Sequence, residues 1–182
     1  MCGIFGISST KPISNQLIKG LSKLEYRGYD SAGISGHDIN SKLVTIKATG
    51  PIKNLKHKLS KLKGITTAVS HTRWATHGQP TLKNTHPHLS EYIGIVHNGI
   101  IENYLDLKSY LKKKGYVFRS DTDSEVICHL MNYYFNKSAD MQSSIISTAN
   151  SLDGSYAIAA INSHTPHTTV SYTHLRAHET HE

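Results

Sequence analysis

The chain has 182 residues, enough for one domain with a hydrophobic core, and its two cysteines form no CxxC pair, which excludes a disulfide framework and a thiolate zinc site. It starts without a signal peptide and contains no apolar run of about 18 residues, so we expect a cytoplasmic protein with no membrane partner. The formal net charge of +7 raises the question of nucleic acid, but no aromatic residues interleave with the lysines, so we expect no nucleic-acid partner.

Strands and helices are expected in blocks along the chain. In chain order, the apolar pattern predicts a strand at residues 2–8, a helix at 14–25, strands at 31–36 and 42–48, a basic amphipathic helix at 52–62, strands at 65–72 and 91–101, helices at 104–114, 122–134 and 140–152, and a strand at 154–161. Because strands and helices do not alternate one by one, this order favours an α+β layered domain over a chain of βαβ units.

Three local signals refine this pattern. Asn98-Gly99 tolerates positive φ and predicts a turn inside the strand at 91–101. Gly115 is expected to end the preceding helix as a C-cap. Thr122 and Glu125 have the spacing of a capping box at the start of the next helix.

The last twenty residues, SHTPHTTVSYTHLRAHETHE, differ from the rest of the chain. Five of the 13 histidines fall between His164 and His181, and apolar residues are sparse there. We therefore expect a domain over residues 1–162 and a foreign or disordered tail over 163–182.

The opening sequence MCGIFGIS places a thiol at the second position. Removal of Met1 would leave Cys2 with a thiol of pKa about 8.5 and an α-amine of pKa about 8, so that one residue supplies both nucleophile and base. Taken alone, the same pattern also fits a small buried residue in a first strand.

Four polar clusters lie at the ends of predicted elements: Cys2-Gly3, EYRGYDSAG (25–33), HTRWATHG (71–78) with HPH (86–88), and HNGIIEN (97–103) followed by SDTDSE (120–125). In this order and spacing, they resemble the class II glutamine amidotransferases, which carry an N-terminal nucleophile. The match is closest to the glutaminase domains of glucosamine-6-phosphate synthases, because the tyrosine and tryptophan of these loops and the THPH segment are typical of them. Phosphoribosylpyrophosphate amidotransferases share the plan and remain an alternative.

The resemblance implies the four-layer αββα sandwich of N-terminal nucleophile hydrolases. It also implies hydrolysis of L-glutamine to glutamate and ammonia through a thioester, with no cofactor. In complete relatives, which are expected to be homo-oligomers, the ammonia aminates fructose 6-phosphate in isomerase domains that this chain lacks. Because the glutaminase domain of similar proteins is longer, we expect a C-terminally incomplete sandwich, and we expect the 182 residues alone to hydrolyse glutamine weakly or not at all.

The resemblance also assigns the catalytic groups. Cys2 is the expected nucleophile, and Asn98 and Gly99 are the expected donors to the oxyanion of the tetrahedral intermediate. Arg27 and Gly28 belong to a segment that, in similar proteins, lies beside the nucleophile and supports its amine.

Glutamine has two charged ends that the site must match. Arg73 offers a planar fork for the α-carboxylate and Asp123 a carboxylate for the α-ammonium, and the resemblance points to the same residues. It places Thr76 and His77 in a loop that closes over glutamine, and Trp74 at the route by which ammonia leaves. From spacing alone, Asp123 also fits a helix cap and Trp74 a core residue.

Two further alternatives concern metal and binding. Five histidines in and near the polar clusters could converge, and they are His71, His77, His86, His88 and His97. No HExxH motif or carboxylate at ligand spacing accompanies them, so we expect no metal. Cys128 is expected in the core, and an inactive basic binding module remains the alternative to an enzyme.

Overall fold

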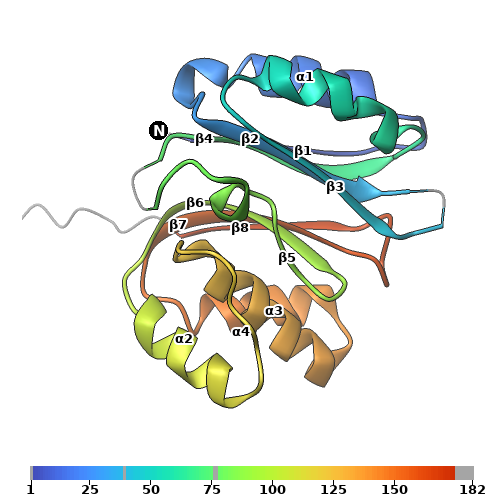
Figure 1. Cartoon of the computed structure of the whole chain (residues 1–182). Coiled ribbons are helices and arrows are strands. Elements are labelled where there is room, and N and C mark those ends of the chain that lie inside the picture. Colours follow the sequence, from blue (N-terminus) through green and yellow to red (C-terminus); the bar gives the residue numbers. More distant parts are fainter. Residues whose placement is uncertain (1, 39, 76–77, 175–182) are drawn as a thin grey trace, which may run out of the picture.

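The structure is a computed structural model that describes residues 2–38, 40–75 and 78–174. Two antiparallel sheets face each other and helices cover both outer faces (Figure 1). The predicted four-layer αββα fold is confirmed.

The first sheet lies under α1 (Ser14–Ser22) and a 3₁₀ segment, η2 (Ile52–Leu62). Its strands are β1 (Gly3–Ser8), β2 (Ser31–His37), β3 (Leu43–Thr49) and β4 (Thr67–Arg73), in the order β1-β4-β2-β3. A short 3₁₀ turn, η1 (Glu25–Arg27), connects α1 to β2. Apolar side chains from α1, η2 and the sheet form one buried core between these two layers.

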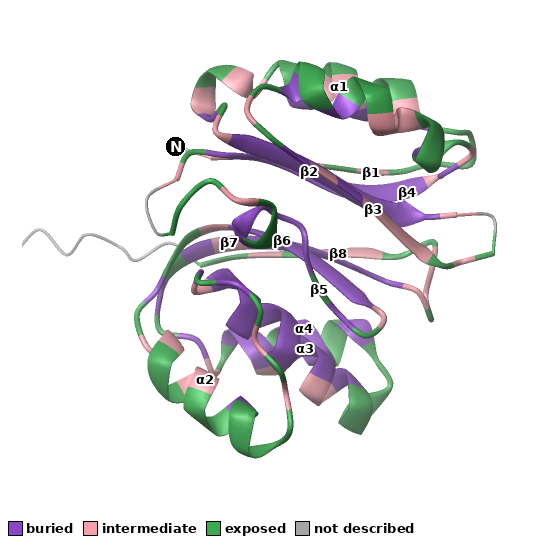
Figure 2. Ribbon diagram, in the orientation of Figure 1, coloured by how far each residue is buried: buried purple, intermediate pink, exposed green. Residues whose placement is uncertain are grey.

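The second sheet lies against α2 (Tyr104–Lys113), α3 (Ser124–Ser138) and α4 (Met141–Ala149). Its strands are β5 (His88–Ser90), β6 (Ile93–Ile101), β7 (Gly154–Asn162) and β8 (Thr169–His174), in the order β5-β6-β7-β8. A 3₁₀ turn, η3 (Leu82–Asn84), precedes β5. Figure 2 shows that α3 is largely buried, whereas α1 and α2 expose their outer faces. No helix in the described part of the chain is long and apolar enough to cross a membrane.

The layer between the two sheets holds a small apolar cluster rather than a large one. Val69, Val96, Ala159 and Ile161 are its buried members. The rest of this layer includes polar side chains, among them several buried histidines of β4, β5 and β6. A polar interior between sheets is what a reaction site needs, provided that each polar atom finds a partner.

The predicted turn at Asn98-Gly99 is wrong. β6 runs through both residues, and they pair with Ala157 and Tyr156 of β7. Gly99 has φ +123°, and a Cβ there would lie 2.1 Å from the Ser155 carbonyl oxygen. Glycine is therefore required by a close strand contact and a positive φ, not by a chain reversal.

The predicted capping box is also wrong. The Glu125 carboxylate accepts from the backbone N–H groups of Arg119 and Ser120, not from that of Thr122. The Thr122 hydroxyl lies 3.2 Å from His88 Nε2 instead. Thr122 is thus used in a contact with β5, and Glu125 binds the backbone just before the helix, so neither side chain forms the cap. The basic segment at 52–62 likewise forms a 3₁₀ segment in place of an α-helix, although its apolar residues recur at spacings of three, four and three, the α-helical pattern.

Regular structure continues past the boundary expected at residue 162. β8 pairs with β7 in an antiparallel register from Tyr156 opposite His174 to Ile161 opposite Thr169. Val170 and Tyr172 of β8 are half-buried against the core of the second sheet. The expected absence of structure is thus wrong for residues 169–174, because strand pairing satisfies the backbone of a polar segment. Residues 175–182 lie outside the described residues.

Because β8 completes the second sheet, a chain ending at residue 162 should be less stable than one ending at residue 174. Removing the half-buried Val170 and Tyr172 should lower the free energy of unfolding by about 2 kcal/mol, measured by urea denaturation followed by circular dichroism. Equal stability of the two chains would mean that β8 contributes nothing to the fold.

Candidate active site

A small pocket of about 40 Å³, open to solvent at its mouth, lies at one end of the layer between the sheets. Its lining comes from five separate parts of the chain: Cys2; His71, Arg73 and Trp74; His86; His97, Asn98 and Gly99; and Thr122, Asp123 and Ser124. Three of the four polar clusters singled out in the sequence therefore line the pocket. The fourth, EYRGYDSAG, lies behind the lining, where its Gly28 packs against the Arg73-Trp74 backbone.

Cys2 occupies the mouth of this pocket and not the core. The pairing of Gly3 with Thr72 in the β1–β4 ladder brings the start of the chain to the end of β4. There the Trp74 backbone N–H donates to Cys2 Sγ at 3.3 Å, and the thiol is half-buried. A thiol held by a backbone donor at an open pocket is available as a nucleophile.

Cys128, unlike Cys2, lies in the core and away from the pocket. It is fully buried in α3, and its thiol contacts the backbone carbonyls of His88 and Ile93. Burial strongly raises the pKa of the Cys128 thiol, so it stays protonated. The expectation of a core residue is confirmed.

Gly28 supports the backbone that holds the thiol. A Cβ on Gly28 would lie 2.7 Å from the carbonyl carbon of Arg73 and 2.8 Å from the nitrogen of Trp74. Only glycine allows this close approach. Arg27, by contrast, does not line the pocket, and its guanidinium lies over the Tyr26 ring, 5.1 Å from the centroid.

The Asn98 side chain is oriented by a buried histidine. Its amide nitrogen donates to the Cys2 carbonyl oxygen at 3.2 Å. Its oxygen lies 2.8 Å from His71 Nε2, which is also 3.0 Å from the His97 carbonyl oxygen. Because both neighbours of Nε2 are acceptors, this nitrogen carries the proton. Burial lowers the pKa of His71 to about 3, so the ring is neutral and donates at Nε2.

The sequence analysis considered His71 only as one of five candidate metal ligands. A sequence signal for its place in the site was nevertheless present. Residues two apart on a strand face the same side, so His71 shares a face of β4 with Arg73. If Arg73 is placed in the site, His71 is expected there as well.

Arg73 ends β4 with its side chain almost completely buried, at 4% exposure. Its guanidinium donates to the carbonyl oxygens of Gly78 at 3.0 Å and Gln79 at 3.3 Å. Burial lowers the pKa of Arg73, and the nearby Cys2, Asp30 and Asp123 oppose that shift. A buried cation in a pocket is suited to bind an anionic group.

Asp123 does not cap α3. Its carboxylate forms no capping bond to a backbone N–H of the first turn of the helix and instead accepts from the Ile101 backbone N–H at 2.9 Å. Ser124 donates to its second oxygen at 3.3 Å and lies 2.8 Å from His97 Nδ1. The capping interpretation is therefore wrong, because the side chain turns across to β6 and into the pocket.

Trp74 is not a core residue. It is 42% exposed, and its ring meets the Tyr29 ring edge to face at 5.4 Å. The next residue is fixed by Asp30, whose carboxylate accepts from the Ala75 N–H at 2.8 Å. Thr76 and His77 lie outside the described residues.

Four of the five candidate histidines do converge. The His86 ring stacks on His71 at 4.2 Å and meets His88 edge-on at 4.6 Å, with His97 at 6.3 Å. Burial lowers the pKa of His88 to about 3 and of His97 to about 4, so these rings are neutral at pH 7. Despite this proximity, the described residues contain no group of three side chains arranged to hold a metal.

The comparisons with known proteins agree on one family. Residues 67–175 match the glutamine amidotransferase domain family. The chain is 46% identical over 168 residues to glutamine–fructose-6-phosphate aminotransferase (isomerizing) from Buchnera aphidicola, covering 91% of this chain and 28% of that protein. It is also 46% identical over 165 residues to the protein of the same name from Francisella tularensis, covering 89% and 27%.

A solved structure has the same fold. Glutamine phosphoribosylpyrophosphate amidotransferase from B. subtilis, complexed with ADP and GMP, superposes with a TM-score of 0.74 at 29% identity. The match covers 90% of this chain and 35% of that one. The chain thus spans about a quarter to a third of the length of the proteins it resembles.

The neutral histidines make the fold sensitive to acid. His88 has a pKa of about 3 in the folded state and about 6.5 when unfolded. As the pH falls below 6.5, the unfolded chain gains a proton that the folded chain does not, which costs about 1.4 kcal/mol of stability per pH unit. We expect His88→Gln to reduce the loss of stability between pH 7 and pH 5 by about 2 kcal/mol, measured by urea denaturation at both values. An unchanged pH dependence would contradict a neutral, buried His88.

Proposed function

The chain belongs to the glutamine amidotransferase family, and from that premise we propose that its pocket hydrolyses L-glutamine to glutamate and ammonia with Cys2 as the nucleophile. The observation that carries this proposal is the assembly of Cys2, Asn98, Arg73 and Asp123 around one pocket. A nucleophile, an amide donor, a cation and an anion are the four groups that cleavage of an amino-acid side-chain amide requires.

In the proposed reaction, the Cys2 thiol gives its proton to the α-amine of the same residue, and the thiolate attacks the side-chain amide carbon. Asn98 Nδ2 and the Gly99 N–H stabilise the resulting oxyanion, a role supported by the His71 bond that turns the Asn98 nitrogen toward Cys2. The α-ammonium of Cys2 then protonates the nitrogen of the side-chain amide, and ammonia departs. Water cleaves the thioester and releases glutamate. The amine is free only after Met1 has been removed.

The two ends of glutamine are assigned to opposite charges of the pocket. The Arg73 guanidinium binds the α-carboxylate, and Asp123 binds the α-ammonium. Burial of Arg73 supports this assignment, since a buried cation is stabilised by an anion that enters beside it. Thr76, His77 and Trp74 are proposed to close the pocket over the substrate. Gly28 supports the nucleophile through the Arg73-Trp74 backbone, and we propose that Arg27 belongs to the same supporting segment.

We further propose that this chain is the glutaminase part of a longer enzyme that uses the ammonia to aminate fructose 6-phosphate. The 46% identity to aminotransferases of that name supports this substrate over phosphoribosylpyrophosphate, since the amidotransferase that acts on the latter is 29% identical. The sugar phosphate would bind outside the 182 residues, which cover 28% of such a relative. A cytoplasmic location, homo-oligomers of the complete enzyme and a domain that includes residues 1–162 and continues through β8 are part of the same proposal.

The sequence alone led us to expect weak or absent hydrolysis, but β8 extends the second sheet beyond the expected boundary and the site residues line one pocket. A chain with Met1 removed should therefore release glutamate from glutamine, and Cys2→Ala should abolish that release. Cys128→Ala is the matched control and should change the rate by less than about two-fold, because this thiol is buried and protonated. Glutamate release is measured with a coupled dehydrogenase assay, and mass spectrometry verifies the N-terminus. Full activity with Met1 retained would contradict the role of the α-amine, and glutamate release by Cys2→Ala would contradict the enzyme itself.

Asn98 and the two charged residues should have different kinetic effects. We expect Asn98→Ala to lower kcat by about 10² to 10³-fold with KM little changed, because the oxyanion exists only in the transition state. Arg73→Ala and Asp123→Asn should mainly raise KM, because each removes a charge contact that contributes about 2 to 5 kcal/mol to the free energy of glutamine binding. Asp123→Asn keeps an acceptor for the Ile101 N–H, so its effect reports the charge. A raised KM with normal kcat in Asn98→Ala would exclude the oxyanion role.

A further inference from the structure

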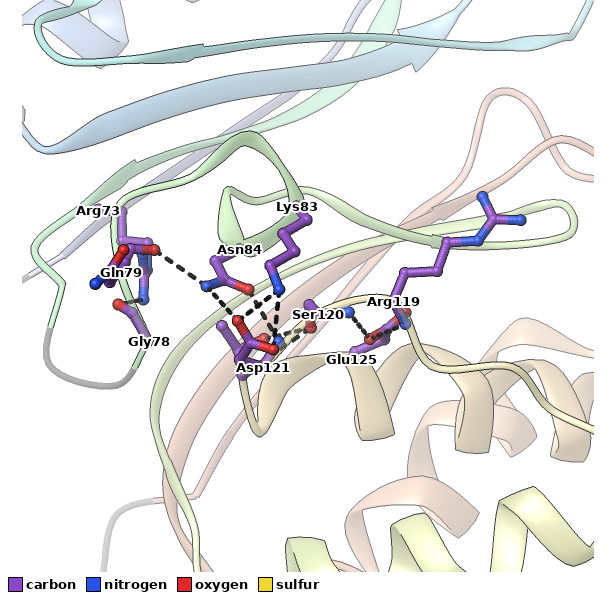
Figure 3. Close-up of polar contacts among 10 residues, drawn as sticks. Arg73, Gly78, Gln79, Lys83, Asn84, Arg119, Ser120, Asp121 and Glu125 are labelled. Atoms are coloured by element: carbon purple, nitrogen blue, oxygen red, sulfur yellow. Dashed lines mark hydrogen bonds and ion pairs between the residues drawn. The ribbon is translucent and has the colours of Figure 1, made fainter.

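The side chain of Asn84, at the end of η3, lies outside the pocket but connects the two segments that carry its charged groups. It is fully buried. One segment is the loop after β4, whose carbonyl groups bind the Arg73 guanidinium. The other is the loop before α3, which leads to Asp123 (Figure 3). A buried polar side chain between two loops destabilises the fold unless its hydrogen bonds are met.

All of the polar atoms of Asn84 have partners. Its oxygen accepts from the Asp121 backbone N–H at 2.9 Å. Its nitrogen donates to the Asp121 carboxylate at 3.2 Å and to the Gln79 carbonyl oxygen at 3.1 Å. An amide is the group that can accept from one loop and donate to both. A carboxylate at this position would face the Asp121 carboxylate and the Gln79 carbonyl with no proton to donate.

The Gln79 carbonyl links Asn84 to Arg73. The same oxygen accepts from Arg73 Nη1 at 3.3 Å, while Gly78 accepts from Nη2 at 3.0 Å (Figure 3). The Asn84 amide therefore fixes the carbonyl that holds the guanidinium. Loss of Asn84 would release the Gln79 carbonyl, one of the acceptors that direct Arg73.

The second loop is fixed to α3 by Glu125. Its carboxylate accepts from the N–H groups of Arg119 and Ser120 at 2.7 to 3.0 Å. Although burial raises the pKa of Glu125, these bonds and His129 outweigh it and lower the value to about 2. The carboxylate therefore stays charged at pH 7. When Asn84 holds Asp121, it holds a loop that is rigidly joined to the start of α3, where Asp123 lies.

We propose that Asn84 is a positioning residue that sets the spacing between Arg73 and Asp123 and so selects a ligand whose carboxylate and ammonium share one carbon. This inference rests on the proposed function and adds a determinant of glutamine binding that does not touch glutamine. Since a displacement of about 1 Å at a binding group can cost 10²-fold, the effect is expected in KM.

The test compares Asn84→Ala with two matched variants in the chain with Met1 removed. Asn84→Ala and the nearly isosteric Asn84→Asp should raise the KM for glutamine by about ten-fold or more, with kcat within about three-fold of the parent. Lys83→Ala removes only an ion pair to Asp121 whose side chains are 52% and 57% exposed, and it should change KM by less than about two-fold. Combining Asn84→Asp with Asp121→Asn restores a donor between the two side chains and should recover part of the loss.

Alkylation of Cys2 separates positioning from general damage. In Asn84→Ala, labelling by 6-diazo-5-oxo-L-norleucine, a glutamine analogue, should slow by the same factor as kcat/KM falls. Labelling by iodoacetamide, which has neither charged end, should stay within about two-fold. Mass spectrometry of both cysteine peptides reports folding as well, because Cys128 is fully buried and reacts only when the core opens.

Three outcomes would overturn the proposal. An unchanged KM in Asn84→Ala excludes a positioning role. An equal fall in labelling by both reagents means that Asn84 supports the pocket as a whole. Appearance of Cys128 labelling in both Asn84 variants assigns the residue to global stability. If the parent chain itself neither hydrolyses glutamine nor prefers the analogue, the proposed function has failed, which is a different result from any of these.

Discussion

The register between β1 and β4 is the constraint on which the site depends. Gly3 lies opposite Thr72, and this pairing brings Cys2 to the Trp74 N–H. A slip of one residue would turn each side chain of β1 to the other face of the sheet and carry the thiol away from Arg73. Phe5 and Ile7 of β1 pack half-buried against the apolar core beneath α1 and η2, and this packing favours the observed register.

The interior between the sheets has a different composition from the two outer cores. It has few large apolar residues, and neutral histidines take the place of part of the apolar packing. Burial keeps His71 and His97 uncharged near pH 7, and each ring forms its hydrogen bonds through one nitrogen, Nε2 of His71 and Nδ1 of His97. This property lets the fold orient Asn98 and Ser124 with buried groups that bear no charge. The same property makes the fold less stable in acid.

The pocket is built by segments that are far apart in the sequence, and side chains outside it hold them together. Asp30 fixes the backbone after Trp74, and Asn84 fixes the loop beyond it to the start of α3. Neither residue lines the pocket. The geometry of the binding groups therefore depends on a supporting shell, which is a general requirement for preorganised sites.

The sequence by itself determined most of the strands and helices, since their apolar periodicity reflects which face is buried. Through the family resemblance of its polar clusters, it also suggested Cys2, Asn98, Arg73 and Asp123 as one site, and all four line one pocket. Tertiary structure decided the rest. Gly99 lies in a strand because β7 pairs with it, and Glu125 binds Arg119 and Ser120 because the chain folds back there. The pairing of β8 and the contacts of Asn84 join residues distant in sequence, and no local pattern records such contacts.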